Sequence, residues 1–365
     1  MFTESASRLV PDLPWTRFGA GALLLTTLAL GGWEAACRAR GYEPGLDDTS
    51  DLWAEARRSV RPDSTVIVGA SRSLFGLDLD VLEAGLGTRP VQLALVGSSP
   101  LPVLDDLAAD ATFHGTVLVD LVPGLLLAPE YSPPYQNAVK AVARHRDQTL
   151  AQRCGHLLSL PLERTFAFLQ QEDLTLAALL DRLPVPDRDG TQVPPALPPF
   201  FYSIDRERRA RMLPSIETDA ALRDRVRFGW LPLFTPPPKP RWIPDEGFGP
   251  AIEAMIEAHF AALTKSVREL TARGCRVVFV RLPSTGELRE LERRLTPRQA
   301  VWDRVLRETG MPGVHFEDHD ELAAFDCPEW SHLTASDSVE FTRRLVPHLR
   351  GALASGQWLS AVVRR

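Results

Sequence analysis

The chain has 365 residues, with a hydrophobic content of 44%, a charged content of 24% and a formal net charge of −6. These values are ordinary for a folded protein and leave ample length for a buried core, in one large domain or two smaller ones. The acidic balance, together with the lack of zinc-finger spacing, a Walker loop or a GxGxxG motif, leads us to expect no nucleic-acid partner.

An uncharged run lies near the N-terminus, where residues 18–33 read FGAGALLLTTLALGGW. Extended to Cys37, the run approaches the ~20 residues that cross a bilayer. Trp15 and Trp33 flank it in the manner of interfacial anchors. We predict an uncleaved membrane anchor over residues 18–37, between a tail (1–17) and a linker (38–60). A buried helix of a soluble cytoplasmic protein is the alternative, and no good A-x-A site supports a cleaved signal peptide.

Arginines on both sides of this run leave its orientation open. Arg8 and Arg17 precede it and Arg38 and Arg40 follow it, so the positive-inside rule gives no decision. Because a large domain after one N-terminal helix is commonly exported, we expect a single-pass protein of the inner (cytoplasmic) membrane with a periplasmic or otherwise extracytoplasmic body. The four scattered cysteines show neither metal-ligand spacing nor a disulfide framework.

Beyond the linker, short apolar runs alternate with segments of helical periodicity. The strand candidates are apolar on both faces, as in a parallel sheet covered by helices. The pattern predicts a three-layer αβα sandwich with a five-stranded parallel sheet, in which loop sites lie at the carboxyl ends of the strands. Strands are expected at residues 65–68, 91–95, 116–121, 276–281 and 314–316, and helices at residues 77–86, 101–109, 252–270, 297–309 and 335–349.

The alternation stops between residues 125 and 250. Helical pieces are expected at residues 137–152 and 162–183, and proline-rich sequences follow that break helices and central strands. We interpret this stretch as an insertion between two parts of one domain, residues 61–124 and 251–350, with residues 351–365 as a C-terminal tail. The insertion would be a lid or a partner-docking surface, or a loop without a role.

Two small-residue turns follow the first two predicted strands. Ser71 stands in Gly69-Ala70-Ser71-Arg72-Ser73, which is not the G-x-S-x-G nucleophile elbow, and by itself it reads best as a helix cap. Its position at the mouth of the sheet also suits a nucleophile whose amide faces an oxyanion. Gly97, followed by Ser98, ends the second strand, where a glycine lets a backbone N–H approach a substrate.

An acid and a histidine precede the last predicted helix, in Glu329-Trp-Ser-His332. This spacing brings a carboxylate to the second ring nitrogen of the imidazole, which holds its tautomer. Asp326 is a rival acid in the same loop, whereas His315 and His319 are less well placed to reach Ser71.

This combination resembles the SGNH hydrolase superfamily, which has a serine after strand one, an oxyanion glycine after strand two and an acid-x-x-His motif before its final helix. The likeness covers residues 60–124 and 250–350 and implies a flavodoxin-like sandwich. The anchored form and the GASR start are most similar to the SGNH-like proteins of envelope polysaccharide acetylation, such as the alginate acetylation proteins. The family's Asn-bearing loop is replaced by a sequence that starts at Asp120. Arg72 or a residue of the insertion is the candidate replacement donor, and Ser98 is a further candidate for the oxyanion or substrate site.

The resemblance implies a membrane-anchored O-acetyltransferase or esterase that acts on an envelope or exported polysaccharide. Ser71 would attack an acyl group, with His332 as general base oriented by Glu329 or Asp326. The expected partners are an acyl donor, a glycan acceptor and, by family resemblance, a membrane-bound acyltransferase, and no cofactor or metal is expected. A catalytically inert envelope binding or assembly protein of the same fold is the alternative.

Overall fold

The computed structural model describes residues 14–170, 200–236 and 244–355, with the single positions Leu174, Leu180, Pro198 and Lys239. A five-stranded, all-parallel sheet has the order β2-β1-β3-β6-β7. The order reverses between β1 and β3, so a crevice is expected at the carboxyl ends of these two strands. The strands are β1 (Thr65–Val68), β2 (Val91–Gln92), β3 (Thr116–Asp120), β6 (Arg276–Arg281) and β7 (Gly313–His315).

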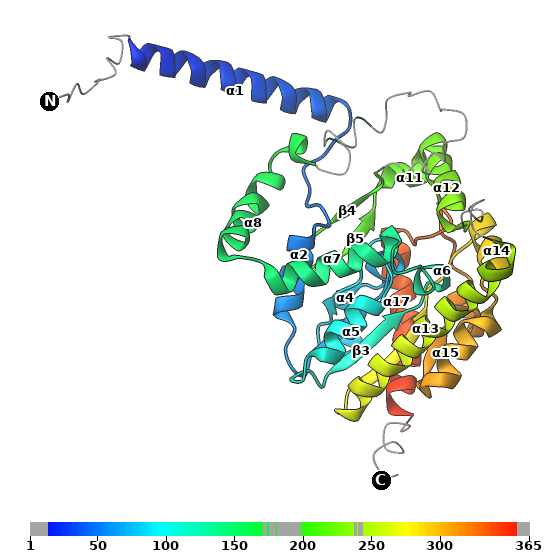
Figure 1. Cartoon of the computed structure of the whole chain (residues 1–365). Coiled ribbons are helices and arrows are strands. Elements are labelled where there is room, and N and C mark those ends of the chain that lie inside the picture. Colours follow the sequence, from blue (N-terminus) through cyan, green and yellow to red (C-terminus); the bar gives the residue numbers. More distant parts are fainter. Residues whose placement is uncertain are drawn as a thin grey trace.

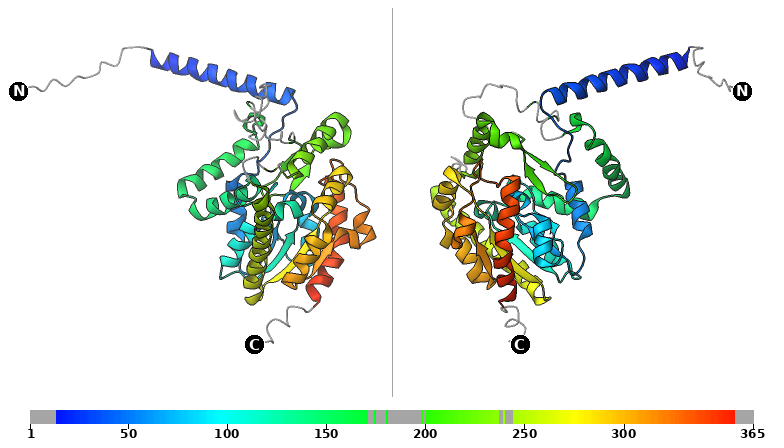
Figure 2. Two further views of the ribbon diagram at one scale, coloured as in Figure 1. Left: turned by 45° about the vertical axis from the view of Figure 1, so that its right-hand side comes forward. Right: turned by 180° about the vertical axis from the view of Figure 1, so that it is seen from behind.

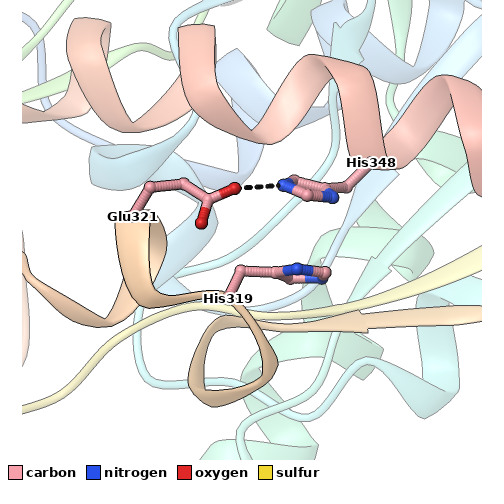
Figure 3. A group of neighbouring side chains, drawn as sticks. All are labelled: His319, Glu321 and His348. Carbon is pink, nitrogen blue, oxygen red and sulfur yellow. Dashed lines mark hydrogen bonds and ion pairs between the residues drawn. The ribbon is translucent and has the colours of Figure 1, made fainter.

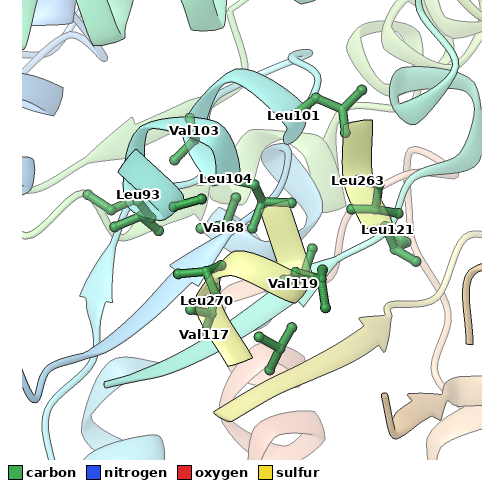
Figure 4. Packing of buried hydrophobic residues seen from close by; sticks show 14 of the residues in the cluster. Val68, Leu93, Leu101, Val103, Leu104, Val117, Val119, Leu121, Leu263 and Leu270 are labelled. Carbon is green, nitrogen blue, oxygen red and sulfur yellow. The ribbon is translucent and has the colours of Figure 1, made fainter. Parts of the chain in front are cut away.

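Both faces of the sheet are covered, which confirms the expected mixed α/β class with a five-stranded parallel sheet (Figure 1). Alternate strand residues point to opposite faces, so Val66 and Val117 pack on one side and Ile67 and Leu118 on the other. Figure 4 shows leucines of α5 and α13 against the valines of β1 and β3. The first face carries α2 (Ser50–Ser59), α5 (Leu101–Ala109), α7 (Pro133–Asp147), α13 (Asp245–Ala272) and α15 (Trp302–Thr309), and the second carries α4 (Leu79–Leu86) and α17 (Ala335–Ala354).

Several element boundaries differ from the sequence-based expectation for local reasons. Helix α4 begins at Leu79 because Asp78 caps it, accepting a hydrogen bond from the Val81 amide at 3.0 Å. Strand β2 covers only two residues; beyond it the Leu93 and Leu95 amides still donate to the Ile67 and Gly69 carbonyls (2.8 and 3.0 Å), and the Gln92 side chain accepts from the Ala94 amide (3.2 Å). Within residues 297–309, Pro297 precedes a 3-10 turn, η2 (Arg298–Ala300), and α15 starts after it.

The helix expected at residues 137–152 is two helices. Helix α7 ends at Asp147, and α8 (Leu150–Glu163) starts at a capping box in which Thr149 and Gln152 bond to each other's backbone amides. Half of residues 162–183 lie outside the described residues, which here include the end of α8 and the 3-10 turn η1 (Ala167–Leu169).

Among the described residues, an antiparallel hairpin and two helices lie between η1 and the start of α13 at Asp245. They are β4 (Tyr202–Ile204), β5 (Ala210–Met212), α11 (Pro214–Thr218) and α12 (Ala220–Phe234). Phe201, Tyr202 and Met212 pack against Leu74 and Phe75 of α3 (Ser71–Gly76), so the hairpin lies beside the turn that follows β1.

The N-terminal helix α1 (Trp15–Ala39) projects from the body and is long and apolar enough to cross a membrane (Figures 1 and 2). It extends beyond the predicted residues 18–37 at both ends. Its last turns meet η1, since Glu34 accepts from the Ala167 and Phe168 amides (3.1 and 3.2 Å) and Arg38 donates to the Thr165 carbonyl (2.9 Å). The stretch expected as a linker is partly folded, because it contains α2.

Candidate active site

The turn after β1 presents Ser71 as the first residue of α3. The N-cap position belongs to Ala70, so Ser71 does not cap the helix. Gly69 allows the turn to close against the end of β3, because a Cβ atom there would lie 2.6 Å from the Cβ of Asp120. The hydroxyl of Ser73 donates to the Ala70 carbonyl (2.9 Å) and braces the turn from within.

Three side chains predicted from the sequence form a continuous hydrogen-bonded chain. Ser71 Oγ lies 2.8 Å from His332 Nε2, and His332 Nδ1 lies 3.0 Å from Glu329 Oε1. Ser71 is half-buried, whereas His332 and Glu329 are 2% and 0% exposed. A carboxylate at Nδ1 favours the tautomer with its proton there, which leaves Nε2 to accept the proton of Ser71.

Glu329, and not Asp326, is the acid that reaches the imidazole. Glu329 Oε1 also accepts from the backbone amides of Ser331 and His332, and Oε2 accepts from the indole N–H of Trp230 at 2.5 Å. Asp326 is exposed and makes no hydrogen bond to His332 within the described chain. Two of the three amide and indole donors come from the loop itself, and the third comes from α12.

Aromatic side chains enclose the imidazole of His332. Ring centroids of Phe75, Trp230 and Phe201 lie 4.3, 5.6 and 5.7 Å from it. Sequence reasoning missed Phe201 and Trp230, since both belong to the stretch taken as an insertion and neither carries a local motif. Their packing restricts rotation of the His332 imidazole and shields it from water except on the side that faces Ser71.

The turn at Gly97 lies beside the Ser71 turn, because the Leu95 amide donates to the Gly69 carbonyl at 3.0 Å. Gly97 is exposed with φ +55°, a Cβ there would meet open space, and its amide has no hydrogen-bond partner among the described residues. The hydroxyl of buried Ser98 donates to the Val96 carbonyl (2.9 Å) within the turn. Of Gly97 and Ser98, only Gly97 has a donor, its backbone N–H, that is not already hydrogen-bonded among the described residues.

The guanidinium of Arg72 is bonded to other side chains and is not free to serve as an oxyanion donor. Its guanidinium, 2% exposed, bonds Glu292 at 2.7 and 3.3 Å and donates to Ser331 Oγ at 3.4 Å. Glu292 also accepts from Arg281 (2.6 Å) and Ser284 (2.8 Å). Burial alone would raise the pKa of Glu292, but the Arg281 and Arg72 charges and these hydrogen bonds lower it to about 2. Arg72 therefore supports the loop that carries His332, through its hydrogen bond to Ser331.

Asp120, at the end of β3 where the SGNH resemblance would lead one to expect an Asn-bearing loop, is buried under the same turn. It is 1% exposed, and neither carboxyl oxygen has a hydrogen-bond partner of normal geometry among the described residues. Burial raises its pKa to about 6, and the charges of Arg281 and Arg72 offset only part of that rise. Asp120 supplies no donor to the site, so the third oxyanion donor has no counterpart at this position.

The other histidines singled out from the sequence lie in separate groups. His315 is buried, and burial lowers its pKa to about 3, so it is neutral. His319 stacks on His348 of α17 (ring centroids 3.7 Å apart), and His348 Nε2 lies 2.8 Å from Glu321 Oε1 of α16 (Asp320–Ala323) (Figure 3). Two imidazoles and a carboxylate form a donor set of the kind that binds zinc. This surface group shares no residue with the Ser71 site.

Comparison with known proteins finds no protein-family model that matches the chain and no curated protein with significant similarity to it. The chemistry of the site is therefore argued from its geometry.

Proposed function

We propose that the chain is a membrane-anchored, SGNH-like serine enzyme that transfers or hydrolyses acyl esters. The observation that carries the proposal is the chain of hydrogen bonds from Ser71 Oγ through both ring nitrogens of His332 to Glu329. A nucleophile bonded to a base that is itself oriented by a buried acid is the arrangement that activates a serine.

In the proposed reaction, Ser71 Oγ attacks the carbonyl carbon of an acyl ester while its proton passes to His332 Nε2. The charge of Glu329 stabilises the imidazolium, and the amides of Ser71 and Gly97 hold the oxyanion. The tetrahedral intermediate collapses as Nε2 returns the proton to the leaving oxygen, which leaves an acyl ester on Ser71. A hydroxyl of the acceptor then gives its proton to Nε2 and attacks this ester, and the second tetrahedral intermediate collapses as Nε2 returns the proton to Ser71 Oγ, which releases the acylated acceptor and the free serine.

The acceptor decides between the two activities. A glycan hydroxyl makes the protein an O-acetyltransferase, and water makes it an esterase, with no cofactor in either case. The apolar helix α1 and the family resemblance support an envelope or exported polysaccharide as acceptor, with the body outside the cytoplasmic membrane and a membrane-bound acyltransferase as a source of acyl groups.

A catalytically inert SGNH-like protein of envelope binding or assembly is the second candidate. The lack of a third oxyanion donor favours it, because Asp120 is buried beneath the turn and the Arg72 guanidinium is engaged by Glu292 and Ser331. Loss of one such donor lowers kcat by about 10²–10³ in enzymes where it has been removed.

Labelling with a fluorophosphonate probe and hydrolysis of p-nitrophenyl acetate distinguish the two candidates. We expect the full chain in detergent to react with the probe, and Ser71→Ala to lose labelling and at least about 10³-fold of the hydrolysis rate. The control Ser59→Ala changes an exposed serine of α2 and is expected to leave both unchanged. A folded wild-type chain that is not labelled, or labelling that survives in Ser71→Ala, favours the inert protein.

A further inference from the structure

Helix α8 carries an apolar stripe on its exposed side. Leu150, Leu157, Leu158 and Leu162 are 75%, 52%, 71% and 51% exposed. Their spacing places them on one helical face, together with exposed Cys154. Four exposed leucines on a helix of 14 residues exceed what scattered surface residues account for.

The opposite side of α8 attaches it to the body. His156, Leu160 and Glu163 are buried, and His156 Nε2 lies 3.0 Å from Glu55 of α2. Because the buried side faces α2, the stripe faces outward, away from the sheet.

Helix α8 lies next to the base of α1. The residues directly after α8 bond the end of α1, through Arg38 to the Thr165 carbonyl and through the Ala167 and Phe168 amides to Glu34. Figures 1 and 2 show α8 on the side of the body toward which α1 extends, with its axis running across that of α1. A bilayer crossed by α1 would therefore meet α8 lengthwise at its surface.

The charges of α8 suit an anionic membrane surface. Arg153 and Arg164, within and at the end of the helix, are exposed, whereas its one acidic residue, Glu163, is buried. Exposed leucines flanked by arginines are typical of helices that lie in the headgroup region.

We propose that α8 is an interfacial helix whose apolar stripe (Leu150, Cys154, Leu157, Leu158 and Leu162) inserts at the surface of the bilayer that α1 crosses. The inference rests on the membrane anchoring in the proposed function and adds a second point of attachment to it. Attachment through both α1 and α8 fixes the orientation of the body, and therefore the position of Ser71, relative to the membrane.

Cys154 permits a direct test, because the other three cysteines are 0–2% exposed. The full chain is spin-labelled at Cys154 and placed in nanodiscs of phosphatidylethanolamine and phosphatidylglycerol that hold one chain each. Power saturation then compares collisions with oxygen, which concentrates in the bilayer, and with a water-soluble nickel chelate. We expect oxygen to be the more effective relaxant at Cys154. In a matched control, Cys154→Ser removes the native labelling site and Arg294→Cys places the label at an exposed position of α14 (Gly286–Leu295). There we expect the nickel chelate to be the more effective relaxant.

Leu158→Glu in the labelled chain is expected to raise the accessibility of Cys154 to the nickel chelate several-fold, whereas Gln152→Glu, exposed on α8 outside the stripe and compatible with the capping box, leaves it unchanged. A wild-type label as open to the chelate as the Arg294→Cys label overturns the proposal. So does a label shielded from both relaxants, which indicates a protein contact.

A third label, Leu24→Cys with Cys154→Ser, separates this inference from the anchoring on which it rests. If Leu24→Cys reports lipid while Cys154 reports water, α1 spans the membrane and only the role of α8 fails. If both report water, the membrane anchoring itself fails.

Discussion

His332 is held in place by residues that lie far apart in the chain. Phe75 follows the nucleophile turn, Phe201 precedes the hairpin, and Trp230 belongs to α12. Each contacts the imidazole, and Trp230 also donates to the acid that orients it. The proposed general base is effective only when its ring is fixed in the reactive orientation, so under the proposed function these contacts matter for rate as well as for stability.

Trp230→Phe removes the indole N–H and keeps an aromatic ring against His332. Glu329 Oε2 then loses its donor, and a hydrogen bond to a charged group contributes about 1.5–3 kcal/mol. We expect kcat for p-nitrophenyl acetate to fall about tenfold with KM nearly unchanged, because Trp230 acts through Glu329 and not on the substrate. Trp33→Phe, on exposed α1, is the matched control. A change in KM alone would assign Trp230 to substrate binding instead.

Asp120 is a buried acid whose ionisation opposes folding. Its pKa is about 6 in the folded chain, against an ordinary value of 3.8. Below about pH 4 both states are protonated and the group has no effect. Between about pH 4 and 6 the unfolded chain ionises while the folded carboxyl keeps its proton, so stability falls, and above pH 6 the full cost of about 3 kcal/mol is reached.

Asp120→Asn keeps the shape of the side chain and removes this titration. The free energy of unfolding of Asp120→Asn minus that of wild type should therefore be about 1 kcal/mol larger at pH 7.5 than at pH 5, which means that the variant gains stability. Denaturant unfolding followed by tryptophan fluorescence measures both values. Asp326→Asn, at an exposed site, should show no such difference between the two pH values. A pH-independent difference for Asp120→Asn would mean that the folded pKa is not raised.

At the scale of elements, the loop before α17 is held by the start of α14. Trp330, between Glu329 and Ser331, has φ +76°, and its carbonyl accepts from the Thr285 amide at 2.9 Å. Its indole covers Gly286, where a Cβ would lie 2.3 Å from the indole nitrogen, and the guanidinium of Arg227 from α12 lies 5.5 Å from its ring centroid. Helices α12 and α14 thus support the strained residue of the acid–histidine loop.

Gly286→Ala is expected to move Trp330 and with it the acid–histidine loop. The backbone there has φ +57°, and the added methyl group meets the indole, so we expect a loss of about 2–4 kcal/mol in unfolding free energy and a fall in esterase activity. Gly274→Ala is the control, since its φ is +86° but its Cβ would meet open space. It should lose only about 1 kcal/mol and keep its activity. Equal effects in both variants would show that the indole contact is unimportant.

At the scale of the whole molecule, α1 is set apart from the rest of the chain. It has 25 residues, projects from the body, and buries only Cys37 among its residues. A soluble protein rarely exposes so large an apolar surface, so a membrane is the simplest environment for this helix.

Leu25→Arg tests the span directly. A charged residue near the centre of a transmembrane helix costs about 2.5–3.5 kcal/mol on insertion. We expect the wild-type chain to stay in the membrane pellet after alkaline carbonate extraction, and the variant to be partly released. Leu295→Arg makes the same change at an exposed leucine of α14 and should stay in the pellet. Full release of the wild-type chain would contradict a membrane span.

The sequence by itself determined the parallel sheet and placed the side chains of the candidate site at one edge of it. Runs such as residues 65–68 and 276–281 are apolar on both faces, a local pattern that needs no knowledge of neighbours, and both are strands with the expected bounds. Because parallel strands end at one edge, Ser71 and Gly97 could be placed near each other, and the acid–histidine spacing added His332. The membrane and glycan assignments remain predictions.

Only the tertiary structure decided how the site is completed. It selected Glu329 over Asp326, engaged Arg72 with Glu292, buried Asp120 beneath the Ser71 turn and brought Trp230 to Glu329. None of these has a local signature, because each depends on residues far apart in the chain, such as Trp230 and Glu329 (99 residues) or Arg72 and Glu292 (220 residues), or on which of two nearby acids faces inward. Periodicity predicts which face of an element is buried, but the partner that it meets is set by how the elements pack.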